Sequence, residues 1–213
     1  MLVIFDCDGV LVDSEKLAAE VFSACLRSLD IQLSAVECMA TFKGHSLDYC
    51  QAFLQKKYRD FPDDFMQMLG AETEAAFSEK LKAVDGVKET LEILQRNNIP
   101  FCVASNGGHK KIKSSLETTA LLPYFSQYRF SCEDVAMGKP APDLFLFAAE
   151  TMQVQARDCW VIEDSLTGVQ AALAAQMHVL VYQTELSHLS LPQGVAGFTS
   201  MRVLPELLLA NDH

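Results

Sequence analysis

Two aspartates follow a short apolar run at the start of the chain. Leu2 to Phe5 has the length and residue types of a strand buried on both faces, and Asp6 and Asp8 come directly after it. In an extended backbone this spacing sends both carboxylates to one side, where they repel each other. A hard cation such as Mg²⁺ is the usual way to offset that charge. A plain acidic turn is the alternative interpretation.

Further polar groups follow the later apolar runs. Ser105 and Asn106 end one of them, Glu163 and Asp164 end another, and Lys139 lies between them in a segment stiffened by prolines. Ligands of open parallel sheets bind at the carboxyl ends of the strands. A cation and a lysine neutralise phosphoryl oxygens, hydroxyl and N–H groups bond to them, and a carboxylate can attack phosphorus. The set therefore predicts a phosphate site.

Each of these groups also has a structural explanation. Ser105 and Asn106 could form a simple turn, Lys139 could be a solvated loop residue, and Glu163 with Asp164 could start a helix. Their joint occurrence at successive strand ends favours the functional interpretation.

The hydrophobic pattern predicts which elements carry these groups. Strands alternating with helices indicate βαβ units and a parallel sheet, whereas the stretch after the first strand is helical throughout. We expect an α/β fold, with a Rossmann-like parallel sheet core flanked by helices in residues 1–14 and 83–213, and an inserted all-α cap in residues 15–82. The predicted strands are 2–5, 100–105, 128–131, 159–162 and 178–182. The predicted helices are 14–29, 34–42, 46–58, 63–81, 87–95, 110–121, 143–152, 165–175 and 204–209.

Composition excludes several classes of protein. The formal net charge of −11 over 213 residues argues against nucleic acid and anionic membrane surfaces as partners. The sequence contains no apolar run of the ~20 residues that a membrane span requires, and no signal peptide pattern. Seven cysteines without CxxC spacing fit buried thiols in a reducing compartment, so we expect a cytoplasmic protein. The oligomeric state stays open, with a monomer slightly favoured.

Four segments resemble the motifs of a known family, the haloacid dehalogenase superfamily of phosphohydrolases. They are Asp6 to Ser14, Ser105 to Gly107, Lys139 to Asp143, and Glu163 to Ser165. The helical insert resembles the α-helical cap of the subgroup that holds β-phosphoglucomutase, phosphoglycolate phosphatase and small sugar-phosphate phosphatases. In overall pattern the chain is similar to phosphatases of six-carbon sugar phosphates, including 6-phosphogluconate.

The resemblance implies roles for the acidic residues. Asp6 is expected to be the nucleophile and Asp8 the general acid/base, which protonates the leaving oxygen and then activates water. Mg²⁺ is expected to be held by the Asp6 carboxylate, the Asp8 backbone carbonyl and Asp164, with Glu163 near the metal. The presence of Asp8 favours phosphate monoesters over the carbon–halogen chemistry of other members.

The resemblance also implies how the substrate is bound. Ser105 and the Asn106 N–H are expected to bind the phosphoryl group, and Lys139 to stabilise its charge and orient Asp6. The cap turn, with the three residues Lys43, Gly44 and His45, resembles the loop that selects the substrate in this subgroup. A turn residue beside a helix start is the alternative for the histidine.

These inferences favour a Mg²⁺-dependent phosphatase that hydrolyses a small phosphorylated metabolite, a sugar or sugar-acid phosphate, through an aspartyl-phosphate intermediate. A β-phosphoglucomutase-like hexose-phosphate mutase is the alternative. The mutases carry a cap histidine nine residues beyond the glycine of the first motif, and counting nine from Gly9 gives Ala18. A catalytically idle scaffold is a third possibility, disfavoured because unused like charges would destabilise the sheet end.

Overall fold

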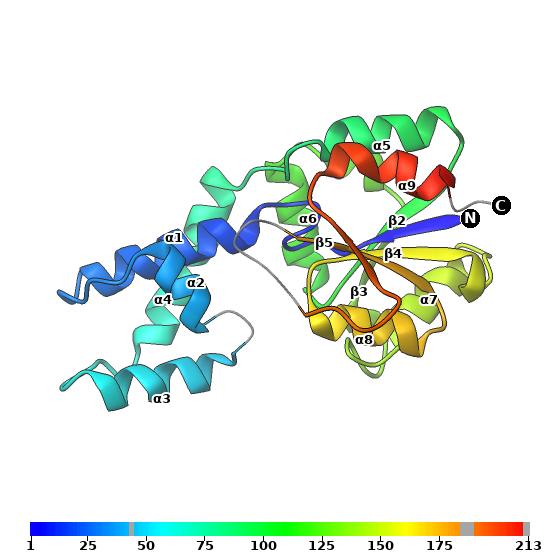
Figure 1. Ribbon diagram of the computed structural model, residues 1–213. Coiled ribbons are helices and arrows are strands. Elements are labelled where there is room, and N and C mark those ends of the chain that lie inside the picture. The colour runs from blue at the N-terminus through cyan, green and yellow to red at the C-terminus, as the bar shows by residue number, and fades with distance from the viewer. Residues whose placement is uncertain (43–44, 184–189, 211–213) are drawn as a thin grey trace. The chain divides into compact units, whose positions relative to one another are not determined.

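A computed structural model of the chain describes residues 1–42, 45–183 and 190–210. The chain divides into two compact units (Figure 1). The α/β unit comprises Met1–Asp13 and Lys82–His213, and the helical unit comprises Ser14–Leu81. The predicted boundaries lay one residue further along the chain at both junctions. No helix among the described residues has the length and apolar character needed to span a membrane.

One sheet of six parallel strands forms the centre of the described α/β unit. In spatial order the strands are β3 (Arg129–Ser131), β2 (Phe101–Ser105), β1 (Leu2–Phe5), β4 (Cys159–Glu163), β5 (His178–Tyr182) and β6 (Ala196–Phe198). The chain runs outward from β1 to β3 on one side and then returns to build the other side from β4. Since this reversal lies between β1 and β4, their carboxyl ends form the position where ligands of such sheets bind. The predicted parallel α/β fold is confirmed.

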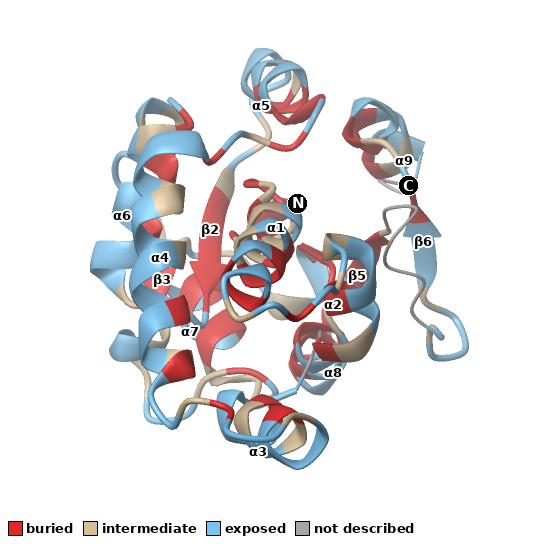
Figure 2. Ribbon diagram, turned by 90° about the vertical axis from the view of Figure 1, so that its left-hand side faces the viewer, coloured by how far each residue is buried: buried red, intermediate tan, exposed pale blue. Residues whose placement is uncertain are grey.

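Helices cover both faces of this sheet (Figure 1). They are α5 (Val87–Arg96), α6 (His109–Thr118), α7 (Asp143–Thr151), α8 (Leu166–Ala174) and α9 (Leu204–Ala210). Short 3₁₀ turns occupy Leu122–Phe125, Cys132–Asp134, Ala156–Asp158 and Met201–Val203. Buried residues of α7 and α8 pack with alternate residues of β1, β2, β4 and β5 in one hydrophobic cluster. Burial on both faces explains the near-continuous apolar runs of the central strands, and β2 is coloured as buried along most of its length in Figure 2.

The sequence prediction missed strand β6. This strand has three residues at the edge of the sheet, where it pairs with β5, and Ala196 and Gly197 in it are exposed. Alanine and glycine have low strand propensity, so the pattern carried little signal. The pairing comes from tertiary contact.

The helical unit contains α1 (Ser14–Arg27), α2 (Ala35–Phe42), α3 (Leu47–Lys57) and α4 (Phe65–Lys80). Its core includes Phe22, whose ring centroid lies 4.7 Å from that of Phe42 and 5.8 Å from that of Phe65. Ser34 and Glu37 begin α2 with reciprocal side-chain to backbone hydrogen bonds of 2.8 and 3.2 Å. These four helices are the ones expected from the sequence, and no strand occurs among the described residues of this stretch.

Candidate active site

The turn after β1 brings Asp6 to the adjacent end of β4. The Asp6 N–H donates to the Ile162 carbonyl at 2.9 Å, and the Leu11 and Val12 N–H groups donate to the Cys7 carbonyl at 3.0 and 3.1 Å. Gly9 has a φ of +78°, and a Cβ at this position would lie 2.4 Å from Oδ2 of Asp164. The glycine is required both for the turn and for this close approach.

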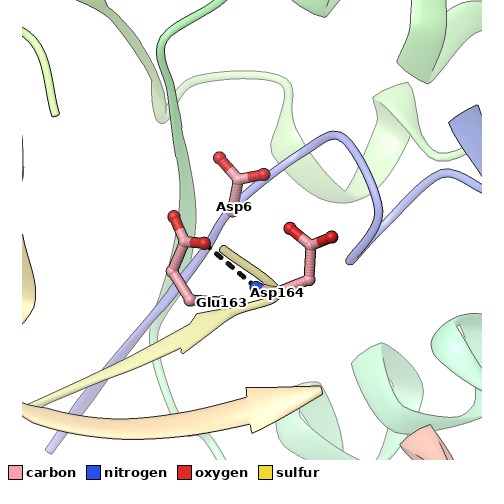
Figure 3. A group of neighbouring side chains, drawn as sticks. All are labelled: Asp6, Glu163 and Asp164. Atoms are coloured by element: carbon pink, nitrogen blue, oxygen red, sulfur yellow. Dashed lines mark hydrogen bonds between the residues drawn. The ribbon is translucent and has the colours of Figure 1, made fainter. Parts of the chain in front are cut away.

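Three buried carboxylates meet at these strand ends. Asp6, Glu163 and Asp164 each offer an oxygen within 4.8 Å of the others, and Figure 3 shows their side chains rising from the ends of β1 and β4. Burial raises the pKa of Asp6 well above its ordinary value, and although Lys139 lowers it, Glu163 and Asp164 raise it further. Oxygen donors with excess negative charge match what a hard divalent cation prefers. The residues present therefore fit a Mg²⁺ site.

Lys139 lies inside this acidic group. Its Nζ donates to Oδ1 of Asp6 at 2.6 Å and to Oε1 of Glu163 at 2.7 Å, and its side chain is 3% exposed. The Nζ also lies 4.7 Å from the centroid of the Phe145 ring on α7. Burial alone lowers the pKa of Lys139, but Asp6 and Glu163 together raise it above its ordinary value. The lysine is therefore a fixed positive charge between two carboxylates.

The Asn106 side chain holds the backbone of Lys139. Its Oδ1 accepts from the Lys139 N–H at 2.8 Å and its Nδ2 donates to the Lys139 carbonyl at 2.9 Å. Ser105 is buried beside it, with its Oγ accepting from the Gly107 N–H at 3.1 Å. The sequence suggested only a backbone role for Asn106, because a pairing across 33 residues has no local signature.

Glu163 is held by hydrogen bonds on both oxygens. Its Oε2 accepts from the Asp164 N–H at 3.0 Å, from the Ser165 N–H at 3.0 Å and from the Ser165 Oγ at 2.8 Å, while Oε1 accepts from Lys139. Gly168 on α8 lies against this carboxylate, and a Cβ there would lie 1.8 Å from Oε1. Gly168 is a residue that sequence reasoning missed, since an isolated helical glycine carries no obvious signal.

Asp8 does not join the carboxylate group through its side chain. Its Oδ2 accepts from Nζ of Lys111 on α6 at 2.6 Å, and the side chains are 26% and 51% exposed respectively. The sequence gave no indication of this lysine, which stands 103 positions from Asp8.

The predicted residues of the helical unit are described only in part. Lys43 and Gly44 lie outside the described residues. The His45 N–H donates to the Phe42 carbonyl at 3.1 Å, and the His45 ring stacks on Tyr49 with centroids 4.1 Å apart. These contacts are those of a turn residue at the start of α3, and they leave a substrate contact for His45 as a proposal.

Comparison with known proteins identifies the family. Residues 1–176 match the haloacid dehalogenase-like hydrolases. The chain belongs to this family. A 6-phosphogluconate phosphatase from Escherichia coli is 29% identical over 219 residues, covering 96% of this chain and 93% of that protein. A phosphorylated carbohydrates phosphatase from Thermotoga maritima is 31% identical over 176 residues, covering 81% and 80%.

Solved structures of this family share the fold. A haloacid dehalogenase family hydrolase from Deinococcus radiodurans, crystallised with bound phosphate and sodium, is 30% identical and superimposes with a TM-score of 0.86 over 98% of this chain and 94% of that one. The predicted family is thus confirmed, and the enzyme is a phosphoric monoester hydrolase.

Proposed function

We propose that this protein is a Mg²⁺-dependent phosphatase that hydrolyses a sugar or sugar-acid phosphate through an aspartyl-phosphate intermediate. The observation that carries the proposal is the buried Asp6 carboxylate, which accepts a hydrogen bond from Lys139 and lies beside the carboxylates of Glu163 and Asp164. The names of the relatives from E. coli and T. maritima, phosphatases of 6-phosphogluconate and of phosphorylated carbohydrates, support the substrate class.

In the first half of the reaction Asp6 attacks phosphorus. A bond forms between an Asp6 oxygen and phosphorus while the bond to the sugar oxygen breaks, and Asp8 gives a proton to that leaving oxygen. The Lys139 ammonium, 2.6 Å from Oδ1, orients the nucleophile and neutralises charge on the transferring group. In the second half Asp8 takes a proton from water, and the water oxygen attacks phosphorus and releases Asp6.

The remaining core residues bind the phosphoryl group or the cation. We assign Ser105 Oγ and the Asn106 N–H to the phosphoryl oxygens. Mg²⁺, held by the carboxylates of Asp6 and Asp164 and the Asp8 carbonyl, would neutralise the phosphoryl oxygens as charge develops on them. Glu163 lies near that position but already accepts four hydrogen bonds, so we assign it the task of fixing Lys139 and contacting the metal through water.

Substrate choice is assigned to the helical unit. A site that grips only the phosphoryl group cannot distinguish one ester from another, so selection needs further contacts to the rest of the substrate. We propose that this unit is the cap and that Lys43, Gly44 and His45 supply such contacts. Cationic and hydrogen-bonding groups in this loop suit a hydroxylated or acidic metabolite. The described cysteines are all free thiols, which supports a cytoplasmic enzyme.

The experiment is a phosphate-release assay on a panel of phosphorylated metabolites, in Mg²⁺ and in EDTA. We expect release from a few sugar or sugar-acid phosphates, dependent on Mg²⁺ and abolished by Asp6→Asn in a folded protein. A variant Asp6→Asn with near wild-type release would remove Asp6 from the mechanism. No release from any member, together with an isomerised sugar phosphate, would instead establish the mutase.

A further inference from the structure

A lysine outside the recognised motifs contacts the general acid. The Nζ of Lys111 donates to Oδ2 of Asp8 at 2.6 Å, a short charge-assisted hydrogen bond. The other oxygen, Oδ1 of Asp8, is buried and has no hydrogen-bond partner among the described residues. Within the described chain, the lysine is thus the group that fixes the rotation of this carboxylate.

The first turn of α6 places Lys111 accurately. The His109 N–H donates to Oε2 of Glu133 at 3.1 Å, and the His109 ring lies 2.9 Å from Oδ1 of Asp134. Ile112, the next residue of α6, is buried, and a Cβ on Gly107 would lie 3.4 Å from Cδ of Lys111. The anchored start of α6 fixes the backbone position of Lys111, and the hydrogen bond to Asp8 fixes its ammonium.

Another lysine of the same helix shows a different environment. The Nζ of Lys113 lies 3.6 Å from Oε1 of Glu117, one turn further along, against 2.6 Å for the pair of Lys111 with Asp8, and Glu117 is 51% exposed whereas Asp8 is 26% exposed. Such a surface pair is worth little to the fold. Lys113 therefore provides a matched control on α6 for a substitution of Lys111.

We propose that Lys111 is a positioning residue that holds the Asp8 carboxylate in line with the leaving oxygen. The inference rests on the proposed role of Asp8 as general acid. The torsion that turns a carboxylate about its stem is soft, so a carboxylate without an anchor samples many orientations. Proton transfer requires hydrogen-bond geometry, and small misplacements of a catalytic group are costly. Lys111 supplies that anchor from the side of α6.

The test compares esters whose leaving groups need protonation to different degrees. An alkyl phosphate releases a strongly basic alkoxide, which requires the acid, whereas p-nitrophenyl phosphate releases a weakly basic phenolate, which does not. We would measure kcat/KM, which reports the steps up to departure of the leaving group, for wild type, Lys111→Met and Lys113→Met. For Lys111→Met we expect the loss on the alkyl phosphate to exceed the loss on p-nitrophenyl phosphate by about tenfold. Lys113→Met should match wild type on both.

Two further variants separate positioning from a purely structural role. Lys111→Arg retains a donor and should recover part of the alkyl-phosphate activity. Adding Lys111→Met to Asp8→Asn should cause little additional loss on the alkyl phosphate, because two residues that act on one step are not additive.

Several outcomes would overturn the inference. Equal losses on the two esters would mean that Lys111 does not act through the acid, and unchanged activity would mean that it has no part in the reaction. Increased activity would mean that it restrains Asp8 in the resting enzyme. If Asp8→Asn itself shows no leaving-group dependence, the assignment of the acid is wrong. A wild-type protein that releases no phosphate from either ester would refute the proposed function, and this role with it.

Discussion

Replacing Lys139 with methionine tests the charge arrangement at the centre of the site. Methionine retains most of the apolar stem but removes the ammonium that lies over the Phe145 ring and donates to Asp6 and Glu163. Those carboxylates are nearly inaccessible to water, at 11% and 1% side-chain exposure. The variant must therefore keep one more unpaired buried charge or bind one more proton.

The size of the effect follows from that additional proton. Protonating a carboxyl of ordinary pKa at pH 7 costs about 4 kcal/mol, and removing one partner of a buried ion pair typically costs about 3–5 kcal/mol. We expect the free energy of unfolding to fall by about 4 kcal/mol at pH 7. Because the folded variant binds one more proton than the folded wild type, the loss should shrink by about 2.7 kcal/mol at pH 5.

The assay is urea unfolding in EDTA at both pH values, followed by the fluorescence of the single tryptophan, Trp160, on β4. Lys113→Met is the control, because its exposed i, i+4 pair is worth at most about 0.5 kcal/mol. A loss below about 1 kcal/mol, or a loss of equal size at pH 7 and pH 5, would refute the view that Lys139 neutralises buried carboxylates.

Three further predictions concern the same site. Gly168→Ala should displace the Glu163 carboxylate, since the new Cβ would lie 1.8 Å from Oε1, and should lower both thermal stability and phosphate release; a variant matching wild type in both would contradict this packing. Asn106→Ala removes two hydrogen bonds to the Lys139 backbone and should lower the free energy of unfolding in urea by about 2 kcal/mol. An unchanged free energy of unfolding would contradict this role of Asn106. Burial is the largest cause that raises the pKa of Asp6 in the folded protein. The folded state therefore binds the Asp6 proton more tightly than the unfolded state does, and this stabilises the protein fully at pH values below the ordinary aspartate pKa. The stabilisation is lost as pH rises through the raised folded-state pKa. Unfolding in EDTA should therefore show stability falling with rising pH in that window, and saturating Mg²⁺ should reduce the fall; identical profiles would argue against a cation at this site.

Local sequence was sufficient to locate the first five strands along the chain and to predict that they are parallel. Central strands such as β1 and β4 are buried on both faces, so nearly every residue in them is apolar and the run stands out from its neighbours. The short edge strand β6 has no such constraint, and it escaped prediction for that reason. The order of the strands was likewise open until their pairing was known, because several orders are compatible with the same βαβ units.

Local sequence also located the acidic groups, because carboxylates directly after buried strands must gather at one edge of a parallel sheet. Which of them touch, and through which atoms, was decided by the tertiary structure. Lys139 reaches Asp6 across 133 positions, and Lys111 reaches Asp8 across 103. The local sequence around a lysine in a loop or on a helix surface does not show whether its ammonium points to solvent or to a carboxylate. Side-chain pairing over such separations depends on how whole elements pack, and no periodicity in the chain records it.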